Sequence, residues 1–407
     1  MNTITKNNSE LWKHKTALFL ISQLFSIFGS SVVSYGVIWY ITLETSSSRV
    51  MMISIITSFL PQIFISLFAG VWADRYNRKL IIMASDLLSA GASLFLALSF
   101  MNGQYSLGLI FLVNAIRSVG IGIQMPAVSA ILPQLVPSDK LARINGINSS
   151  LSSMLMLVAP AVGGFLLATM GFSATLYVDV FTATIAVIIL AFLKYEKVLR
   201  PADENAYPVP ASTLSYMKEG FLYTKNHPLL KNLLIFYTIF FFLVTPVAFL
   251  TPILVERSFG PEVWKLTANE VMWTLGSVIG GVIISLWGGF KNRLATMALS
   301  CAGFGITFTM LGFATNIWIY FGIIFLSGIF MPMFGTAETV LIQENVEESM
   351  LGRVFSFVQI IISSVMPLGM LLFGPLGDAI KIEYIIVATG ICLMILAPFI
   401  MKIAKYE

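Results

Sequence analysis

Four ionisable side chains interrupt long apolar stretches of the sequence. Arg117 lies near the middle of one stretch, and Asp86, Asp179 and Glu338 lie closer to the ends of three others. A charged group is costly inside a hydrocarbon layer, so such a residue is usually retained for a function. We therefore expect Arg117, Asp179 and Glu338 to be candidates for coupling proton movement. For Arg117 the alternative is a structural ion pair with a carboxylate on a neighbouring helix.

A short charged segment, "GVWADRYNRK" at 70–79, joins two of the apolar stretches. Its cations can pair with carboxylates or anionic lipid heads, and its aspartate can sit against the positive end of a helix. We expect a cytoplasmic latch that opens when two helical bundles separate; the alternative is the ordinary excess of cations in inner loops. An acid in the following stretch is close enough to be its partner. The expected latch residues are Gly70, Asp74, Arg75, Arg78, Lys79 and Asp86.

Polar side chains also recur at helical spacing in the first apolar stretch. Ser22, Ser26 and Ser30 are four residues apart, which favours a helix facing a watery cavity; the alternative is that the hydroxyls bond their own backbone. A later stretch, "FYTIFFFLVTPVAFLTP", is rich in aromatic residues that suit either a large amphiphilic ligand or lipid. The expected cavity-lining residues are Ser22, Gln23, Ser26, Ser30, Tyr35, Tyr237 and Phe241.

The apolar stretches themselves predict a membrane protein. Of 407 residues, 57% are hydrophobic and only 11% are charged, with a mean hydropathy of +0.88, whereas soluble proteins carry about a quarter of their residues as charges. Each stretch is long enough to cross the hydrocarbon as a helix and does not alternate as barrel strands do. We expect an all-α polytopic protein with twelve spans, at 16–43, 50–72, 80–101, 106–132, 144–168, 173–193, 232–255, 267–288, 294–313, 316–342, 354–376 and 384–401.

Several function classes are disfavoured. The two cysteines and two histidines show no metal-site spacing, and no phosphate-binding G-x-x-x-x-G-K-[ST] motif is present, so we expect no metal and no cofactor. No nucleophile–base set supports an enzyme. The basic residues form no tract, so nucleic acid is not expected as a partner. The polar start, "MNTITKNNSELWKHK", does not predict a removable signal peptide.

Lysine and arginine positions predict the orientation. With the N-terminus in the cytoplasm, nineteen of the 24 fall in inner segments, and only Arg49, Arg257, Lys265 and Lys381 fall in outer loops. Cations concentrate on the cytoplasmic side of membrane proteins. An even number of spans then places both termini inside.

The chain is expected to divide into an N-terminal bundle at 1–193, a linker at 194–231 and a C-terminal bundle at 232–407. The linker contains "RPADENAYPVP" and then "LSYMKEGFLYTKNHP", for which we expect a helix on the membrane surface or, alternatively, a solvated connector. "GIQMP" at Gly122–Pro126 returns as "GIFMP" at Gly328–Pro332, which indicates a duplication of six spans. Such repeats are common in transporters.

Two motifs carry a resemblance to the major facilitator superfamily. The segment at 70–79 resembles that superfamily's loop signature G-x-x-x-D-[RK]-x-G-R-[KR], with Asn77 replacing a glycine and expected to adopt the same left-handed backbone. A degenerate counterpart, "GGFKNR", lies at Gly288–Arg293. The fifth span resembles the antiporter motif G-x8-G-x3-G-P-x2-G-G, which the family links to export, although Leu155 and Ala159 depart from it; plain small-residue packing is the alternative. The matching residues are Gly146, Pro160, Gly163 and Gly164.

Over most of its length the sequence resembles the macrolide-efflux-type branch of bacterial drug:proton antiporters. The resemblance implies a monomer in the bacterial cytoplasmic membrane that exports a hydrophobic or amphiphilic compound, such as a macrolide, in exchange for protons. It also implies that Arg117 takes part in proton coupling. The alternatives are export of an endogenous molecule, such as a siderophore or lysophospholipid, and more remotely a membrane-embedded enzyme or scaffold. Protons, the small substrate and membrane lipid are the expected partners.

The latch interpretation predicts that Asp74→Asn impairs transport without removing the protein from the membrane, because the segment loses its only anion. Transport measured in cells with matched membrane levels checks this. Normal transport by the variant would reduce the segment to a set of topology-determining cations.

Overall fold

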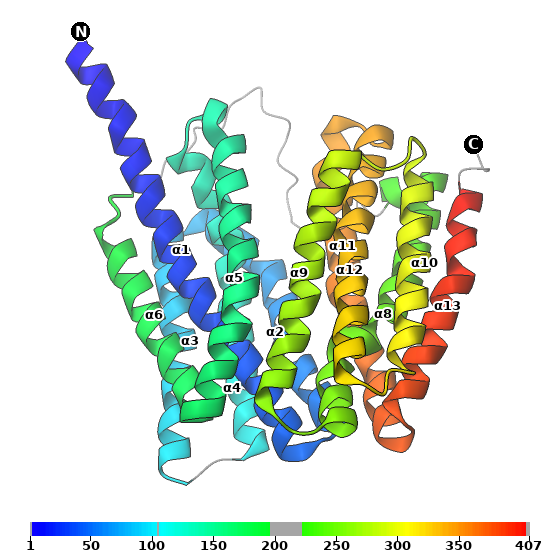
Figure 1. Cartoon of the computed structure of the whole chain (residues 1–407). Helices are drawn as coiled ribbons and strands as arrows, with labels where there is room; N and C mark the ends of the chain where they lie inside the picture. Colours follow the sequence, from blue (N-terminus) through cyan, green and yellow to red (C-terminus); the bar gives the residue numbers. More distant parts are fainter. Residues whose placement is uncertain (1, 104–105, 196–221, 404–407) are drawn as a thin grey trace. The chain divides into compact units, whose positions relative to one another are not determined.

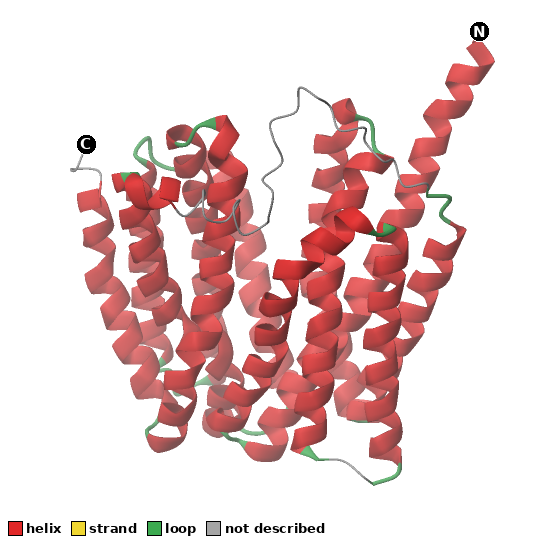
Figure 2. Ribbon diagram, turned by 180° about the vertical axis from the view of Figure 1, so that it is seen from behind, coloured by secondary structure: helices red, strands yellow, loops and turns green. Residues whose placement is uncertain are grey.

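The computed structural model describes residues 2–103, 106–195 and 222–403, and within these ranges all regular structure is helical. Figures 1 and 2 show long helices joined by short loops. Twelve helices are long and apolar enough to cross a membrane, which confirms the predicted number of spans. They are α1 (Asn2–Thr45), α2 (Ser48–Arg75), α3 (Arg78–Met101), α4 (Leu107–Leu135), α5 (Leu141–Met170), α6 (Phe172–Phe192), α8 (Pro228–Phe259), α9 (Val263–Trp287), α10 (Arg293–Leu311), α11 (Ile317–Asn345), α12 (Glu348–Ala379) and α13 (Ile382–Ile403).

Asparagine side chains cap the helices that follow the two short charged loops. The Asn77 side-chain oxygen accepts from the Lys79 backbone N–H at 3.0 Å, and Asn292 does the same for Leu294 at 3.0 Å. Each cap satisfies a backbone donor that the first helical turn cannot satisfy. Asn77 has φ −70° and ψ 113°, so the expected left-handed backbone was wrong: this residue is retained as an extended N-cap.

The sequence repeat corresponds to a structural repeat. Helices α4 and α11 each contain 29 residues, and Pro126 of α4 and Pro332 of α11 occupy equivalent positions of the repeated motif. Each ends at a valine with extended backbone, Val136 at φ −115°, ψ 133° and Val346 at φ −118°, ψ 135°. The same helix–short turn–helix element therefore recurs in both halves of the chain.

The chain forms two compact units. The first comprises Met1–Tyr40 and Thr57–Val209, and the second comprises Ile41–Ile56 and Pro210–Glu407. The boundary at 209–210 lies inside the predicted linker. The turn between α1 and α2, however, belongs to the second unit, which a division into consecutive segments did not anticipate. Most of the predicted linker helix lies outside the described residues; residues 222–226 are helical.

An ion pair holds the α1–α2 turn within the second unit. The Asp378 carboxylate on α12 accepts from the backbone N–H groups of Ser48 and Arg49 at 2.8 and 3.1 Å, so it caps the start of α2. Arg257 on α8 donates to Asp378 at 2.9 Å and to the Gly377 carbonyl at 2.7 Å. A carboxylate at a helix N-terminus is stabilised by the unpaired N–H groups there. This contact explains why 41–56 is part of the second unit.

Glycines allow α9 and α11 to approach backbone to backbone. A Cβ atom on Gly276 would lie 2.0 Å from the Phe325 carbonyl oxygen, and one on Gly280 would lie 2.2 Å from that of Ile329. The Ser277 hydroxyl donates to the Gly328 carbonyl at 3.1 Å across the same interface. Small residues four apart are a recurrent means of close helix packing in membranes. This packing fixes the rotation of α9.

We predict that Gly280→Ala destabilises the protein by about 1–3 kcal/mol, because overpacking forces the α9 and α11 backbones apart. Gly281→Ala is the matched control, since no atom lies within 4 Å of a Cβ placed there. Thermal unfolding of the purified variants checks this. Equal melting temperatures for the two variants would contradict the close contact.

Candidate functional site

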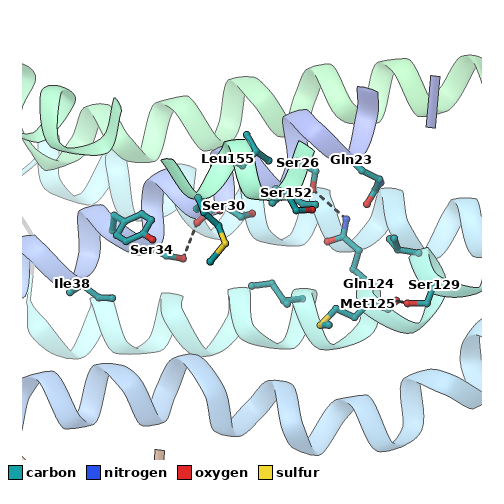
Figure 3. Close-up of a pocket in the computed structure, with 16 residues that line it drawn as sticks. Gln23, Ser26, Ser30, Ser34, Ile38, Gln124, Met125, Ser129, Ser152 and Leu155 are labelled. Carbon is teal, nitrogen blue, oxygen red and sulfur yellow. Dashed lines mark hydrogen bonds between the residues drawn. The ribbon is translucent and has the colours of Figure 1, made fainter. Parts of the chain in front are cut away.

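The first unit contains a cavity of about 630 Å³ between α1, α4 and α5. Figure 3 shows its hydroxyl-lined wall on α1 with methionine and glutamine side chains of α4 on another side. This volume lies within the range of small-molecule sites, which combine apolar surface with a few polar groups. The polar residues of its wall are Gln23, Ser26, Ser30, Ser31, Ser34, Tyr35, Gln124, Ser129 and Ser152.

Four of the expected cavity residues, Gln23, Ser26, Ser30 and Tyr35, line this cavity. The fifth on the same helix does not: Ser22 is fully buried and donates to the Phe19 carbonyl at 2.7 Å, which is the backbone-bonding alternative.

Five of the polar lining residues were not anticipated from the sequence: Ser31, Ser34, Gln124, Ser129 and Ser152. Two of them could have been found from the sequence. Ser34 continues the four-residue spacing of Ser26 and Ser30, and Gln124 lies inside the repeated motif "GIQMP". Ser152 on α5 had no such signal.

The expected cavity role of Tyr237 and Phe241 is corrected by their packing. Both side chains are buried in the second unit, in an aromatic cluster with Phe240 and Phe334. The rings of Phe240 and Phe334 stack with their centroids 4.3 Å apart. The aromatic run of α8 therefore forms helix–helix contacts, for which stacked and edge-on rings are well suited.

A carboxylate lies directly behind the cavity wall at Ser26. The Ser26 hydroxyl donates to Asp86 Oδ1 at 2.6 Å, and the Gln124 amide donates to the same oxygen at 2.9 Å. Asp86 Oδ2 is buried and accepts no hydrogen bond from the described residues. Asp86 has no ion pair with Arg78 or Lys79, so its expected role as a latch partner is corrected. It lies instead behind the cavity wall, where Ser26 of α1 and Gln124 of α4 supply its donors.

A buried ion pair lies behind the wall near Ser30. Arg117 on α4 pairs with Asp179 on α6, and both side chains are at most 6% exposed. Ser93 on α3 accepts from Arg117 and donates to Asp179 Oδ2 at 2.7 Å. The Ser30 hydroxyl approaches Asp179 Oδ1 at 3.5 Å. This ion pair is the structural role that we gave as the alternative for Arg117. The side chain of Ser30 lies between the cavity and the Asp179 carboxylate.

Glu338, the remaining coupling candidate, lies in the second unit. It is nearly buried on α11, beside the Tyr237 side chain. It therefore has no part in the Arg117–Asp179 pair, and its role in coupling stays a prediction.

The cations of the predicted latch tie helices together within the first unit. Arg78 donates to the Ala130 carbonyl on α4 at 3.0 Å, and Lys79 donates to the carbonyls of Ala191 and Leu193 at 2.8 Å. Those last carbonyls lie at the C-terminal end of α6, where cations are favoured.

The remaining latch residues are Gly70, Asp74 and Arg75. The side chain of Asp74 lies outside the described residues. Arg75 is exposed, and a Cβ on Gly70 would have no neighbour within 4 Å. In the second unit, the counterpart loop forms an ion pair between Arg293 and Glu344 at 3.1 Å, a partner that the sequence did not reveal.

The antiporter-type motif lies on α5, partly against α1. A Cβ on Gly163 would lie 3.4 Å from the Val32 carbonyl oxygen, and Pro160 and Gly164 are buried. Gly146 has no neighbour within 4 Å of its Cβ position. The motif residue Leu155, where the family has glycine, lines the cavity. Close packing explains part of the motif, and the leucine adds apolar surface to the site.

Comparisons by family model, by sequence and by structure each find a match over most of this chain. The family model described as "Transmembrane secretion effector" matches residues 9–406. Macrolide efflux protein A of Streptococcus pyogenes is 28% identical over 401 residues, covering 97% of this chain and 98% of that protein. Multidrug efflux pump Tap of Mycobacterium bovis is 24% identical over 374 residues, covering 89% and 87%. The crystal structure of a bacterial homologue of the human lysosomal transporter Spinster superposes with a TM-score of 0.73 at 14% identity, covering 98% and 97%.

We predict that Asp179→Asn destabilises the protein by about 3–5 kcal/mol, because it leaves the Arg117 charge buried without its partner. Asp139→Asn is the control: its pair with Lys140 is largely exposed and contributes at most about 1 kcal/mol. Thermal unfolding in detergent checks both. If the Asp179 variant melted with the wild type, the pair would not be a stabilising contact.

Proposed function

The chain belongs to the transmembrane secretion effector family of the major facilitator superfamily, and from this premise we propose that it exports a hydrophobic or amphiphilic drug, such as a macrolide, in exchange for protons. The chain is a multi-pass membrane transporter with macrolide-efflux and multidrug-efflux relatives, and not an enzyme. The proposal adds the substrate class, the proton gradient as the energy source without a cofactor, and alternating access. It also includes a monomer in lipid with both termini in the bacterial cytoplasm.

The cavity of the first unit carries the proposal. It joins apolar surface from Ile121, Met125 and Met156 to the hydroxyl stripe of α1. An amphiphilic compound needs both kinds of surface: apolar contacts supply most of the affinity and a few polar groups orient the ligand. Methionine side chains adapt to irregular shapes, which suits bulky cargo.

Proton coupling is supported by where the carboxylates lie. Ser26 contacts both the cavity and Asp86, and Ser30 contacts both the cavity and Asp179. A ligand that displaces either hydroxyl changes the hydrogen bonding of a buried acid, and thus the cost of its charge. Substrate binding and protonation of these acids are linked in this way without direct contact between them.

An endogenous cargo, such as a siderophore or lysophospholipid, is the second candidate. The same cavity suits such a cargo, because a wall with both apolar and polar residues accepts a lipid-like molecule as well as a drug. A panel of drugs tested in a pump-deficient host separates the two: drug resistance supports the first, and a complete lack of resistance supports the second.

We predict that Ser152→Phe lowers macrolide uptake into inverted membrane vesicles several-fold, because the ring fills the cavity. Ser153→Phe is the matched control, since its side chain is exposed and does not line the cavity. A protonophore should abolish uptake by the wild type. Uptake that persists without a proton gradient would contradict proton coupling, and equal uptake by both variants would contradict the cavity as the substrate site.

A further inference from the structure

The second unit contains a smaller cavity that the proposed mechanism does not use. It has a volume of about 150 Å³ and lies between α8, α9 and α11. Its lining includes Glu270, Asn269 and Trp273 on α9, together with Thr251 and apolar side chains of α8 and α11. We propose that this cavity is a separate site that binds the protonated alkylamine of a cationic transported compound, with the Glu270 carboxylate and the Trp273 ring as its recognition groups.

Glu270 is held in a fixed position without a cationic partner. Its Oε1 accepts from the side-chain amide Nδ2 of Asn269 at 3.1 Å, and the side-chain Oδ1 of Asn269 accepts from the Tyr320 hydroxyl at 3.0 Å. Asn269 and Tyr320 are both buried, so this chain orients the carboxylate. Within the described residues no lysine, arginine or histidine nitrogen lies within 4.0 Å of it. A carboxylate inside a membrane protein is normally paired with a cation. Because no described side chain supplies that cation for Glu270, a positively charged ligand can take its place.

The nearest cation on the same helix is already engaged. Lys265 donates to the Glu262 carboxylate at 2.6 Å and to the Phe259 carbonyl. The hydrogen bond from the Lys265 ammonium lowers the pKa of the Glu262 carboxyl below its ordinary value. Glu262 therefore stays charged and keeps Lys265 at the start of α9, away from the cavity.

Trp273 supplies a rigid aromatic wall one turn after Glu270. Its ring stacks on Phe304 with centroids 6.2 Å apart and an interplanar angle of 24°. The glycine-mediated contact with α11 brings the Trp273 backbone close, since a Cβ on Gly328 would lie 2.2 Å from the Trp273 carbonyl oxygen. A tryptophan ring attracts an organic cation through its quadrupole. The carboxylate and the ring therefore act on the same charge.

The size and polarity of the cavity favour an organic cation over a metal ion. A cavity of about 150 Å³ accepts a molecule the size of benzene, which is comparable to a dimethylamino or trimethylammonium group. Calcium and magnesium ions require about six or more oxygen ligands, whereas Val244, Val247, Ala248 and Ile324 make much of this wall apolar. Methyl groups on a charged nitrogen match such a wall.

This inference rests on the proposed export function, and binding separates the two. The probe is a labelled macrolide with a dimethylamino sugar, compared with its neutral derivative made by N-demethylation and N-acylation. Equilibrium dialysis measures the affinity of each for the purified full-length protein. The variants are Glu270→Gln, Trp273→Leu and, as the matched carboxylate control, Glu262→Gln.

We expect wild type to bind the amine more tightly than the neutral derivative. Glu270→Gln should weaken amine binding about thirtyfold or more, as expected when a desolvated charge loses its partner, and leave binding of the neutral derivative unchanged. Trp273→Leu should weaken amine binding about two- to thirtyfold, and Glu262→Gln should match the wild type. Unchanged binding of the neutral derivative also shows that a variant is folded; if Glu270→Gln does not fold, Trp273→Leu decides.

Three results would overturn the inference: wild type binds neither compound, its preference for the amine survives in Glu270→Gln, or that variant loses both compounds equally. The last result would make Glu270 a structural or proton-carrying residue. Proteoliposome transport tests the export function separately. If the wild type binds the amine through Glu270 but transports nothing, the amine site is supported and the export function is contradicted. If the wild type transports the compound but does not prefer the amine, the export function is supported and the amine site is contradicted.

Discussion

The requirement that polar groups find partners inside a bundle of membrane helices governs this structure. Water is absent from the hydrocarbon layer, so each charge must be met by another side chain or by the backbone. Arg117 and Asp179 satisfy this requirement through each other and through Ser93, on three different helices. Asp378 is partly exposed and caps α2, in a contact that assigns 41–56 to the second unit. The buried pair holds its helices in register, because removing either Arg117 or Asp179 leaves the other charge buried without a partner.

The same requirement connects the cavity of the first unit to its acids. Ser26 and Ser30 each have one side toward the cavity and one toward a carboxylate. A hydroxyl can donate one hydrogen bond at a time, so a ligand that claims it takes it from the acid. Under the proposed function, this shared use of donors links an occupied site to Asp86 and Asp179.

Duplication preserved the scaffold and left the chemistry of the two units different. Asn77 and Asn292 cap equivalent helices, and α4 and α11 have the same length. Arg117, by contrast, corresponds to the buried apolar Ile323, so the described part of the second unit has no copy of the ion pair at this position. It has instead a small cavity with an uncompensated carboxylate. Helix length and caps follow from bilayer thickness and backbone hydrogen bonding, which act equally on both copies, whereas side-chain chemistry was free to diverge.

The sequence by itself determined the helical class, the twelve spans and which polar residues the bilayer would force inward, because hydrophobic length and backbone satisfaction are local properties. It also indicated the α1 stripe, since helical spacing places Ser26 and Ser30 on one face. Only the tertiary structure decided the partners: Asp86 with Ser26 and Gln124 instead of the nearby cations, Tyr237 and Phe241 in a core instead of a cavity, and Glu270 with no cation among the described residues. A partner on another helix depends on helix rotation and packing, which small residues such as Gly280 set through contacts with distant segments, and no local pattern along the chain records them.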